Sequence, residues 1–175
     1  MSYVKPRLLS GFILSLGVGV LLSLSQANAQ EAAQRTVEQH GDWAALCKAT
    51  DAKSCYIVQR ILLGDNDKPV LELAVGRPAN NPTEISTMIL TLPLGIRLPE
   101  GFGLEIGTTL KRKYPFERCI KSGCQTEIQL DTELVQNLQG QNEGRVVFLD
   151  STKKTIAIPF SLKGFTKAYS KVLGQ

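Results

Sequence analysis

The sequence predicts an all-β protein, an antiparallel β-sandwich of the immunoglobulin-like kind with one or two short helices and two disulfides. Short runs rich in β-branched and aromatic residues recur between turn signals, as in sandwich proteins. Proline and glycine interrupt the middle of the chain too often for a long helix. Neither an alternation of strands and helices nor a repeat of fixed period is visible. A small, mostly open barrel is the alternative architecture.

Strand candidates follow one another from the first tryptophan to near the end of the chain. The run 55–63 has the strongest strand composition, and the turn cluster 64–68 joins it to 70–75 as a hairpin. The runs 108–119 and 125–130 flank the second cysteine loop and predict another hairpin. Further strands are expected at 43–47, 85–92, 146–149 and 155–162, with short pieces within 93–107.

Two helices are predicted, both short. Residues 131–138 begin with an aspartate that suits an N-cap, carry an acid in the first turn and precede Gly140. Residues 164–173 predict a closing helix, with Phe165, Ala168, Tyr169 and Val172 facing inward.

The composition limits the possible classes of protein. With 43% hydrophobic and 21% charged residues, the 175-residue chain is neither disordered nor fibrous, and its length suits one domain. Lysine and arginine number 20 against 16 acids, a net charge of +4. This mild excess does not indicate a dedicated nucleic-acid binder.

The N-terminus resembles a targeting segment rather than a part of the fold. Lys5 and Arg7 precede an uncharged apolar run over 8–24, and Ala27-Asn28-Ala29 forms a small-residue cleavage site. This pattern predicts a secretory signal peptide at 1–29 and an exported protein without a later transmembrane segment. An N-terminal membrane anchor is the alternative, which the cleavage site disfavours. Residues 30–40 are polar and predict a flexible lead-in to a β-sandwich domain at 41–175.

The four cysteines, Cys47, Cys55, Cys119 and Cys124, all follow the predicted signal peptide. An even number in an exported chain indicates disulfides. Of the three possible pairings we favour Cys47 with Cys55 and Cys119 with Cys124, because each pair closes a short polar loop across a predicted hairpin. The entropy of loop closure does not by itself select this pattern. Zinc binding and thiol–disulfide catalysis are disfavoured, because neither paired C-x₂-C knuckles nor a C-x-x-C motif is present.

No catalytic, cofactor-binding or metal-binding residues are assigned from the sequence, and no cofactor is expected. His40 is the only histidine and therefore the only conventional histidine base, but no G-x-S-x-G motif accompanies it. We expect this side chain to be exposed before the first strand. A pair of carboxylates brought together by the fold remains open, so the alternative to a non-enzymatic protein is an envelope enzyme acting on cell-wall glycan.

A basic stretch stands out on the second predicted hairpin. It interleaves Tyr114 and Phe116 with five cations: Lys111, Arg112, Lys113, Arg118 and Lys121. Such a stretch suits contact with an anionic polymer, such as lipopolysaccharide or glycosaminoglycan, and the mild overall charge argues against nucleic acid. The alternative is a solvated hairpin whose lysines protect an edge strand from pairing. We expect Trp43 to be a core residue rather than a binding platform.

Several short motifs, in this order along the chain, resemble the invasion-associated locus B family of exported alphaproteobacterial proteins. The motifs are Gly41-Asp42-Trp43, Leu94-Gly95, Pro99-Glu100-Gly101, Tyr114-Pro115-Phe116, Ser122-Gly123-Cys124 and Leu162-Lys163-Gly164-Phe165. The resemblance covers about residues 41–173. It implies a β-sandwich with two disulfides, a location in the periplasm or at the outer membrane, and a link to host-cell invasion in some members. It assigns no catalytic residue. The expected function is that of a non-enzymatic envelope binding module with an unknown envelope or host-surface partner.

Overall fold

The computed structural model describes residues 35–49, 51–64, 68–77 and 85–174, apart from the side chains of 51–53. Residues 34–175 form one compact unit. The predicted signal peptide and the first part of the predicted lead-in lie outside the described residues.

The described residues of this unit form eleven strands and two helices. In chain order they are β1 (Arg35–His40), β2 (Trp43–Lys48), β3 (Asp51–Ile61), β4 (Leu71–Gly76), β5 (Thr87–Leu92), β6 (Phe102–Ile106), β7 (Leu110–Tyr114), β8 (Arg118–Ile120), β9 (Gly123–Gln129), α1 (Thr132–Gly140), β10 (Glu143–Leu149), β11 (Thr155–Ser161) and α2 (Phe165–Val172).

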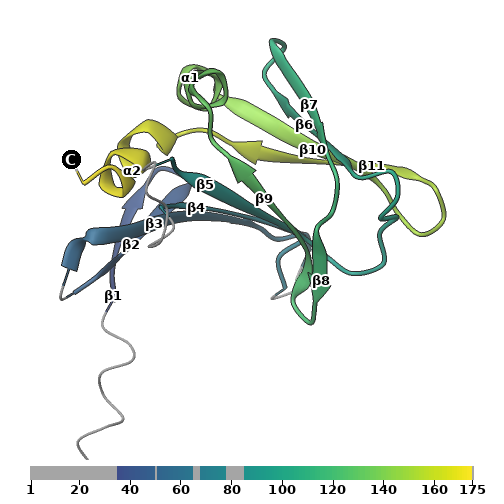
Figure 1. Ribbon diagram of the computed structural model, residues 1–175, viewed down its shortest axis with the longest axis horizontal. Helices are drawn as coiled ribbons and strands as arrows, with labels where there is room; N and C mark the ends of the chain where they lie inside the picture. The colour runs from purple at the N-terminus through teal and green to yellow at the C-terminus, as the bar shows by residue number, and fades with distance from the viewer. Residues whose placement is uncertain (1–34, 50, 65–67, 78–84, 175) are drawn as a thin grey trace, which may run out of the picture. The chain divides into compact units, whose positions relative to one another are not determined.

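The strands form two antiparallel sheets. One has seven strands in the order β1-β2-β3-β4-β5-β9-β8, and the other has four in the order β11-β10-β6-β7 (Figure 1). The first five strands follow one another as hairpins, and the chain then crosses to the smaller sheet and returns through β8 and β9. The predicted antiparallel sandwich is thus confirmed. Its two sheets have seven and four strands, whereas those of an immunoglobulin constant domain have four and three.

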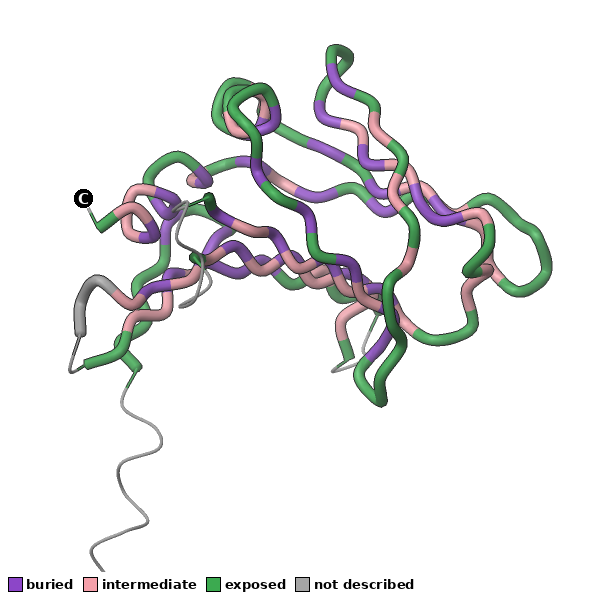
Figure 2. The backbone as a smooth tube through the Cα atoms, viewed as in Figure 1, coloured by how far each residue is buried: buried purple, intermediate pink, exposed green. Residues whose placement is uncertain are grey.

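The core lies between the sheets and is built by residues that alternate along each strand. Leu71, Leu73 and Val75 of β4 are fully buried, while the residues between them are not. Successive side chains of a strand point to opposite faces, so this period of two places one face inward (Figure 2). Trp43 and Phe102 are among the largest fully buried side chains, which confirms Trp43 as a core residue.

The two helices form where the sequence predicts them. Asp131 is the N-cap of α1, where its carboxylate accepts a 2.8 Å hydrogen bond from the backbone N–H of Leu134. The helix α2 (yellow in Figure 1) packs on β1, β2, β3 and β4. Its four predicted inward residues are all buried: Phe165, Ala168, Tyr169 and Val172.

The predicted flexible lead-in is wrong over its second half. Residues Arg35–His40 form β1, which pairs antiparallel with β2 from Arg35 opposite Lys48 to His40 opposite Trp43. All of its residues except His40 are exposed, because β1 is the edge strand of the sheet. Backbone hydrogen bonds to β2 therefore hold this strand, and a sequence pattern based on hydrophobic side chains does not detect it.

Both predicted disulfides are confirmed. Cys47 and Cys55 lie opposite each other on β2 and β3, and Cys119 and Cys124 lie opposite each other on β8 and β9. Each therefore closes a hairpin. Among the described residues, no helix is long and apolar enough to span a membrane.

Candidate functional site

Two motifs from opposite ends of the domain meet at one contact. Gly41 lies in the β1–β2 turn and Gly164 precedes α2, both with positive φ. A Cβ atom on Gly41 would lie 2.4 Å from the carbonyl oxygen of Lys163, and one on Gly164 would lie 2.0 Å from that of His40. Any larger residue would force the two segments apart. The backbone N–H of Asp42 donates a 3.0 Å hydrogen bond to the Lys163 carbonyl across the same contact.

The aromatic residues of these two motifs complete the contact. Trp43 meets Phe165 edge to face, with ring centroids 5.1 Å apart. The indole N–H of Trp43 donates to the carbonyl of Ser161, at the end of β11. These residues therefore join the β1–β2 turn, β11 and α2.

Gln59 connects the two sheets through its buried amide. Its Nε2 donates to the carbonyls of Asp42 and Ser161, and its Oε1 accepts from the N–H of Ser161. The side chain thus pairs with the outer backbone edge of β11 as a neighbouring strand would. The sequence does not single out Gln59, because a polar residue within an apolar strand is not distinguishable by pattern from a solvent-facing one.

A second pair of motifs meets in the smaller sheet. Gly101 has positive φ, and a Cβ atom there would lie 2.2 Å from the carbonyl oxygen of Tyr114. Phe102 stacks on Tyr114 at 5.7 Å and contacts Phe116 at 5.2 Å. The hydroxyl of Thr126 donates to the carbonyl of Pro115. These motif residues are therefore explained by close packing between segments.

A cleft of about 630 Å³ opens where the two sheets meet at the β1–β2 turn. The end of β3, the start of β10 and the end of β11 complete its lining, with apolar surface from Ile61, Leu62 and Phe160. Two acidic residues, Asp42 and Glu143, also line it. Of the acidic residues whose side chains are described, these two alone make neither a hydrogen bond nor an ion pair through their carboxylates. The fold thus brings two unpaired acids into one cleft, a possibility that the sequence leaves open.

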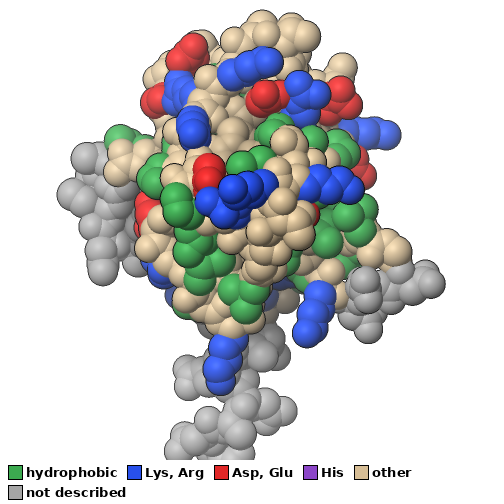
Figure 3. Space-filling model, turned by 90° about the vertical axis from the view of Figure 1, so that its right-hand side faces the viewer, with side chains coloured by type: hydrophobic (Ala, Val, Ile, Leu, Met, Phe, Trp, Pro, Cys, Tyr) green, Lys and Arg blue, Asp and Glu red, His purple; other side chains and the backbone are tan. Residues whose placement is uncertain are grey.

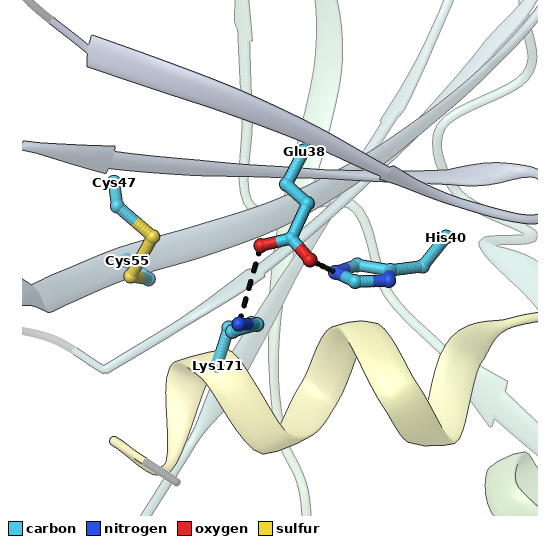
Figure 4. The surroundings of a disulfide bond; sticks show 5 residues. All are labelled: Glu38, His40, Cys47, Cys55 and Lys171. Carbon is cyan, nitrogen blue, oxygen red and sulfur yellow. Dashed lines mark ion pairs between the residues drawn. A yellow bond between two sulfur atoms is a disulfide. The ribbon is translucent and has the colours of Figure 1, made fainter.

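His40 is buried rather than exposed, so that expectation is wrong. Its side chain is 2% exposed, and its Nε2 lies 3.3 Å from Oε1 of Glu38. The other oxygen of Glu38 lies 3.2 Å from Nζ of Lys171 on α2, next to the Cys47–Cys55 disulfide (Figure 4). The hydrogen bond from Lys171 lowers the pKa of Glu38. The burial follows from register, because His40 lies opposite Trp43 on the face that α2 covers.

The basic stretch is divided between the two sheets. Lys111, Arg112 and Lys113 lie on β7, the edge strand of the smaller sheet, and not in a hairpin with β9 as predicted. Arg118 lies on β8, the edge of the larger sheet, and Lys121 lies in the turn after it. The chain leaves the smaller sheet after Tyr114–Pro115, which separates the two groups.

Acidic residues pair with three of these five cations. Arg112 contacts Asp131 and Glu133 at the start of α1, and its hydrogen bond lowers the pKa of Asp131. Nζ of Lys111 lies 3.7 Å from Oε1 of Glu105, and Nη1 of Arg118 lies 3.0 Å from Oε1 of Glu127. Figure 3 views the molecule from the right-hand side of Figure 1 and shows Lys and Arg side chains interspersed with acidic ones over the upper part of that face.

Lys113 and Lys121 have no acidic ion-pair partner among the described residues. The position of Lys111 and Lys113 on the edge strand β7 also suits the alternative role of edge protection.

Comparison with known proteins identifies the family. The family model described as invasion associated locus B (IalB) protein matches residues 43–173. The chain belongs to the IalB family. No curated protein matches the chain.

Among solved structures, the IalB chain is similar to the crystal structure of invasion associated protein B from Bartonella henselae. The two share 19% sequence identity, with a TM-score of 0.69 over 79% of this chain and 96% of the other. At this identity the likeness supports the sandwich fold alone.

Proposed function

We propose that this IalB protein is an exported, non-enzymatic binding protein of the cell envelope, in the periplasm or at the outer membrane. The observation that carries the proposal is the family match together with two disulfides in hairpins, which form in oxidising compartments. The motifs around Gly41, Gly101 and Gly164 are used for packing, which leaves other parts of the surface and the cleft for recognition. A link to host-cell invasion, as the family name describes, belongs to this proposal.

Surface proteolysis of intact cells tests the location. A protein at the outer face is digested while a periplasmic control protein survives. A protein in the periplasm becomes sensitive only after the outer membrane is opened. Recovery of the protein in the cytoplasmic fraction with reduced cysteines would contradict both the periplasmic and the outer-membrane location.

We propose contact with an anionic polymer, such as lipopolysaccharide or glycosaminoglycan, through the five cations of the basic stretch. Lys113 and Lys121 are expected to contribute most, because the other three already contact acids. Replacing both by Gln is expected to weaken binding to heparin and lipopolysaccharide more than replacing Lys111 and Arg118. Unchanged binding after neutralising all five would refute this contact.

A cell-wall glycan hydrolase is the second candidate, favoured by one observation. Asp42 and Glu143 place two unpaired carboxylates in the same cleft, as hydrolysis of a glycosidic bond requires. Release of glycan fragments from purified peptidoglycan, abolished by Asp42→Asn or Glu143→Gln but retained by Glu117→Gln, would replace the binding proposal. No release by the wild-type protein is the result we expect.

A further inference from the structure

One end of the seven-stranded sheet is marked by a row of residues that the register aligns. The row runs across five strands: Arg60, Glu72, Thr91, Gln125 and Arg118. The chain leaves the sheet within a few residues of this row after β3, after β5 and after β8. The connections that follow these strands therefore lie at the same end.

Exposed hydrophobic residues collect at this end of the sheet. Seven large hydrophobic residues are exposed in the described chain, and five of them follow the row: Leu62, Leu63, Leu94, Leu98 and Ile120. Leu94 is 58% exposed, Leu98 46% and Ile120 47%. Single exposed hydrophobic residues are ordinary, whereas their collection at one end indicates a contact surface.

The β10–β11 turn brings lysines to the same end. Ile96 forms a bridge with Asp150, and Ser151 N–H donates to the carbonyl of Gly95, so this turn lies beside the connection that carries Leu94 and Leu98. Lys153 and Lys154 in the turn are exposed, as is Lys121 at the tip of the β8–β9 hairpin.

We call the segments 93–101, 119–123 and 150–154 the loop end. It contains four cations and two acids, a net charge of +2. Both acids are already engaged, because Glu100 pairs with Arg97 and Asp150 accepts hydrogen bonds from its own turn. The three lysines have no acidic ion-pair partner among the described residues. Figure 3 views this end of the molecule and shows hydrophobic side chains with Lys and Arg among them over its lower part.

We propose that the loop end docks on a phospholipid surface with anionic headgroups. Leu94, Leu98 and Ile120 enter the boundary between headgroups and acyl chains, while the lysines contact the headgroup phosphates. The Cys119–Cys124 disulfide closes the hairpin that presents Ile120 and Lys121, so this tip is ordered before it binds. The inference rests on the envelope location proposed above.

A phospholipid surface fits the loop end better than a second copy of the chain. A symmetric dimer through this surface places two patches of charge +2 against each other, and like charges oppose such an interface. An anionic headgroup layer supplies the opposite charge, and it accepts loops without needing a complementary pocket.

Sedimentation with lipid vesicles tests the proposal on the processed protein purified from the cells that make it. Vesicles of phosphatidylcholine mixed with phosphatidylglycerol are compared with phosphatidylcholine alone. We expect binding to the mixed vesicles that weakens with salt. Replacing Leu94, Leu98 and Ile120 by Ser is expected to weaken it about tenfold or more, and replacing Lys121, Lys153 and Lys154 by Gln to weaken it about fivefold for each lysine.

Matched variants control for charge and hydrophobicity elsewhere. Val37→Ser removes a side chain that is 66% exposed on β1, and the triple change of Lys48, Lys163 and Lys167 to Gln removes the same charge away from the loop end. Val37→Ser is expected to bind as the wild type does, and the triple lysine control is expected to lose less than the loop-end triple. Near-ultraviolet circular dichroism confirms that each variant is folded.

Three outcomes would overturn the docking. They are no vesicle binding by the wild type, equal binding by the loop-end serine variant, or self-association in sedimentation equilibrium that this variant alone abolishes. Surface proteolysis reports the location independently. If the protein is found in the envelope but does not bind vesicles, this result refutes the docking and leaves the proposed envelope function in place.

Discussion

Two regions of the molecule are built from similar parts and differ in what covers them. The region under α2 is the part of β1, β2 and β3 that this helix covers, and the other region is the loop end. Each contains a disulfide that closes a hairpin and a glycine that touches backbone from another segment. Under α2, Trp43 and Phe165 are fully buried and the charges of Glu38 and Lys171 are paired. At the loop end, Ile120 and Lys121 face solvent.

A hairpin closed by a disulfide therefore has a different role in each region. A stapled hairpin beneath a helix adds to the stability of the core, whereas a stapled hairpin at an exposed tip holds a surface in a fixed shape. Changes under α2 are therefore expected to act on unfolding, and changes at the loop end on binding.

The largest expected effect compares Trp43→Ala with Ile120→Ser. Removing the fully buried indole leaves a cavity and removes one of the two side-chain hydrogen bonds to the Ser161 carbonyl, so we expect a loss of about 3–5 kcal/mol in the free energy of unfolding. Ile120→Ser is expected to change it by about 0.5 kcal/mol or less. Urea unfolding measures both. Similar losses for the two variants would show that the loop end is part of the core.

The next effect compares the two disulfides, each replaced by a pair of alanines. Loop-closure entropy predicts a loss of about 2.5 kcal/mol for Cys47–Cys55 and about 2 kcal/mol for Cys119–Cys124. We expect the first to exceed the second, because α2 packs over that strand pair. Urea unfolding under non-reducing conditions is the measurement, and the reverse order would contradict the division into a covered and an exposed hairpin.

A smaller effect concerns the N-cap of α1, which lies outside both regions and serves as a reference for them. Asp131→Ala removes the acceptor for the Leu134 N–H and is expected to cost about 1 kcal/mol. Asp131→Asn keeps an oxygen acceptor and is expected to cost less. If the two variants unfold alike, the contact of Asp131 with Arg112 matters more than the cap.

The smallest effect is the pH dependence of the pair under α2. Lys171 lowers the pKa of Glu38 in the folded protein, so the pair stabilises the fold above the ordinary carboxyl pKa and loses this contribution as the pH falls through the lowered value. The difference in Tm between the wild type and Glu38→Gln is expected to be present at neutral pH and to shrink in acid. Glu143→Gln, with no partner to lose, is the control and is expected to show no such change.

Most of the fold follows from local patterns in the sequence. The alternation of Leu71, Leu73 and Val75 indicates a strand with one buried face, and the spacing of Phe165, Ala168, Tyr169 and Val172 indicates a helix with one buried side. The short loops between cysteines indicate their pairing. These signals are local because side-chain direction repeats with the period of the element itself.

What the sequence by itself could not decide depends on contacts between distant segments. The strand β1 is held by backbone pairing, and the basic stretch is divided because the chain changes sheets after Tyr114. Asp42 and Glu143 line one cleft only because segments distant in sequence come together there. The loop end likewise exists only because the register aligns the ends of β5 and β8 and because Ile96 pairs with Asp150 of the β10–β11 turn. The sequence by itself determined most of the strands and both helices and favoured the cysteine pairs that form, whereas the tertiary structure alone decided which charges and exposed hydrophobic residues share a surface, because no local period encodes distances between segments.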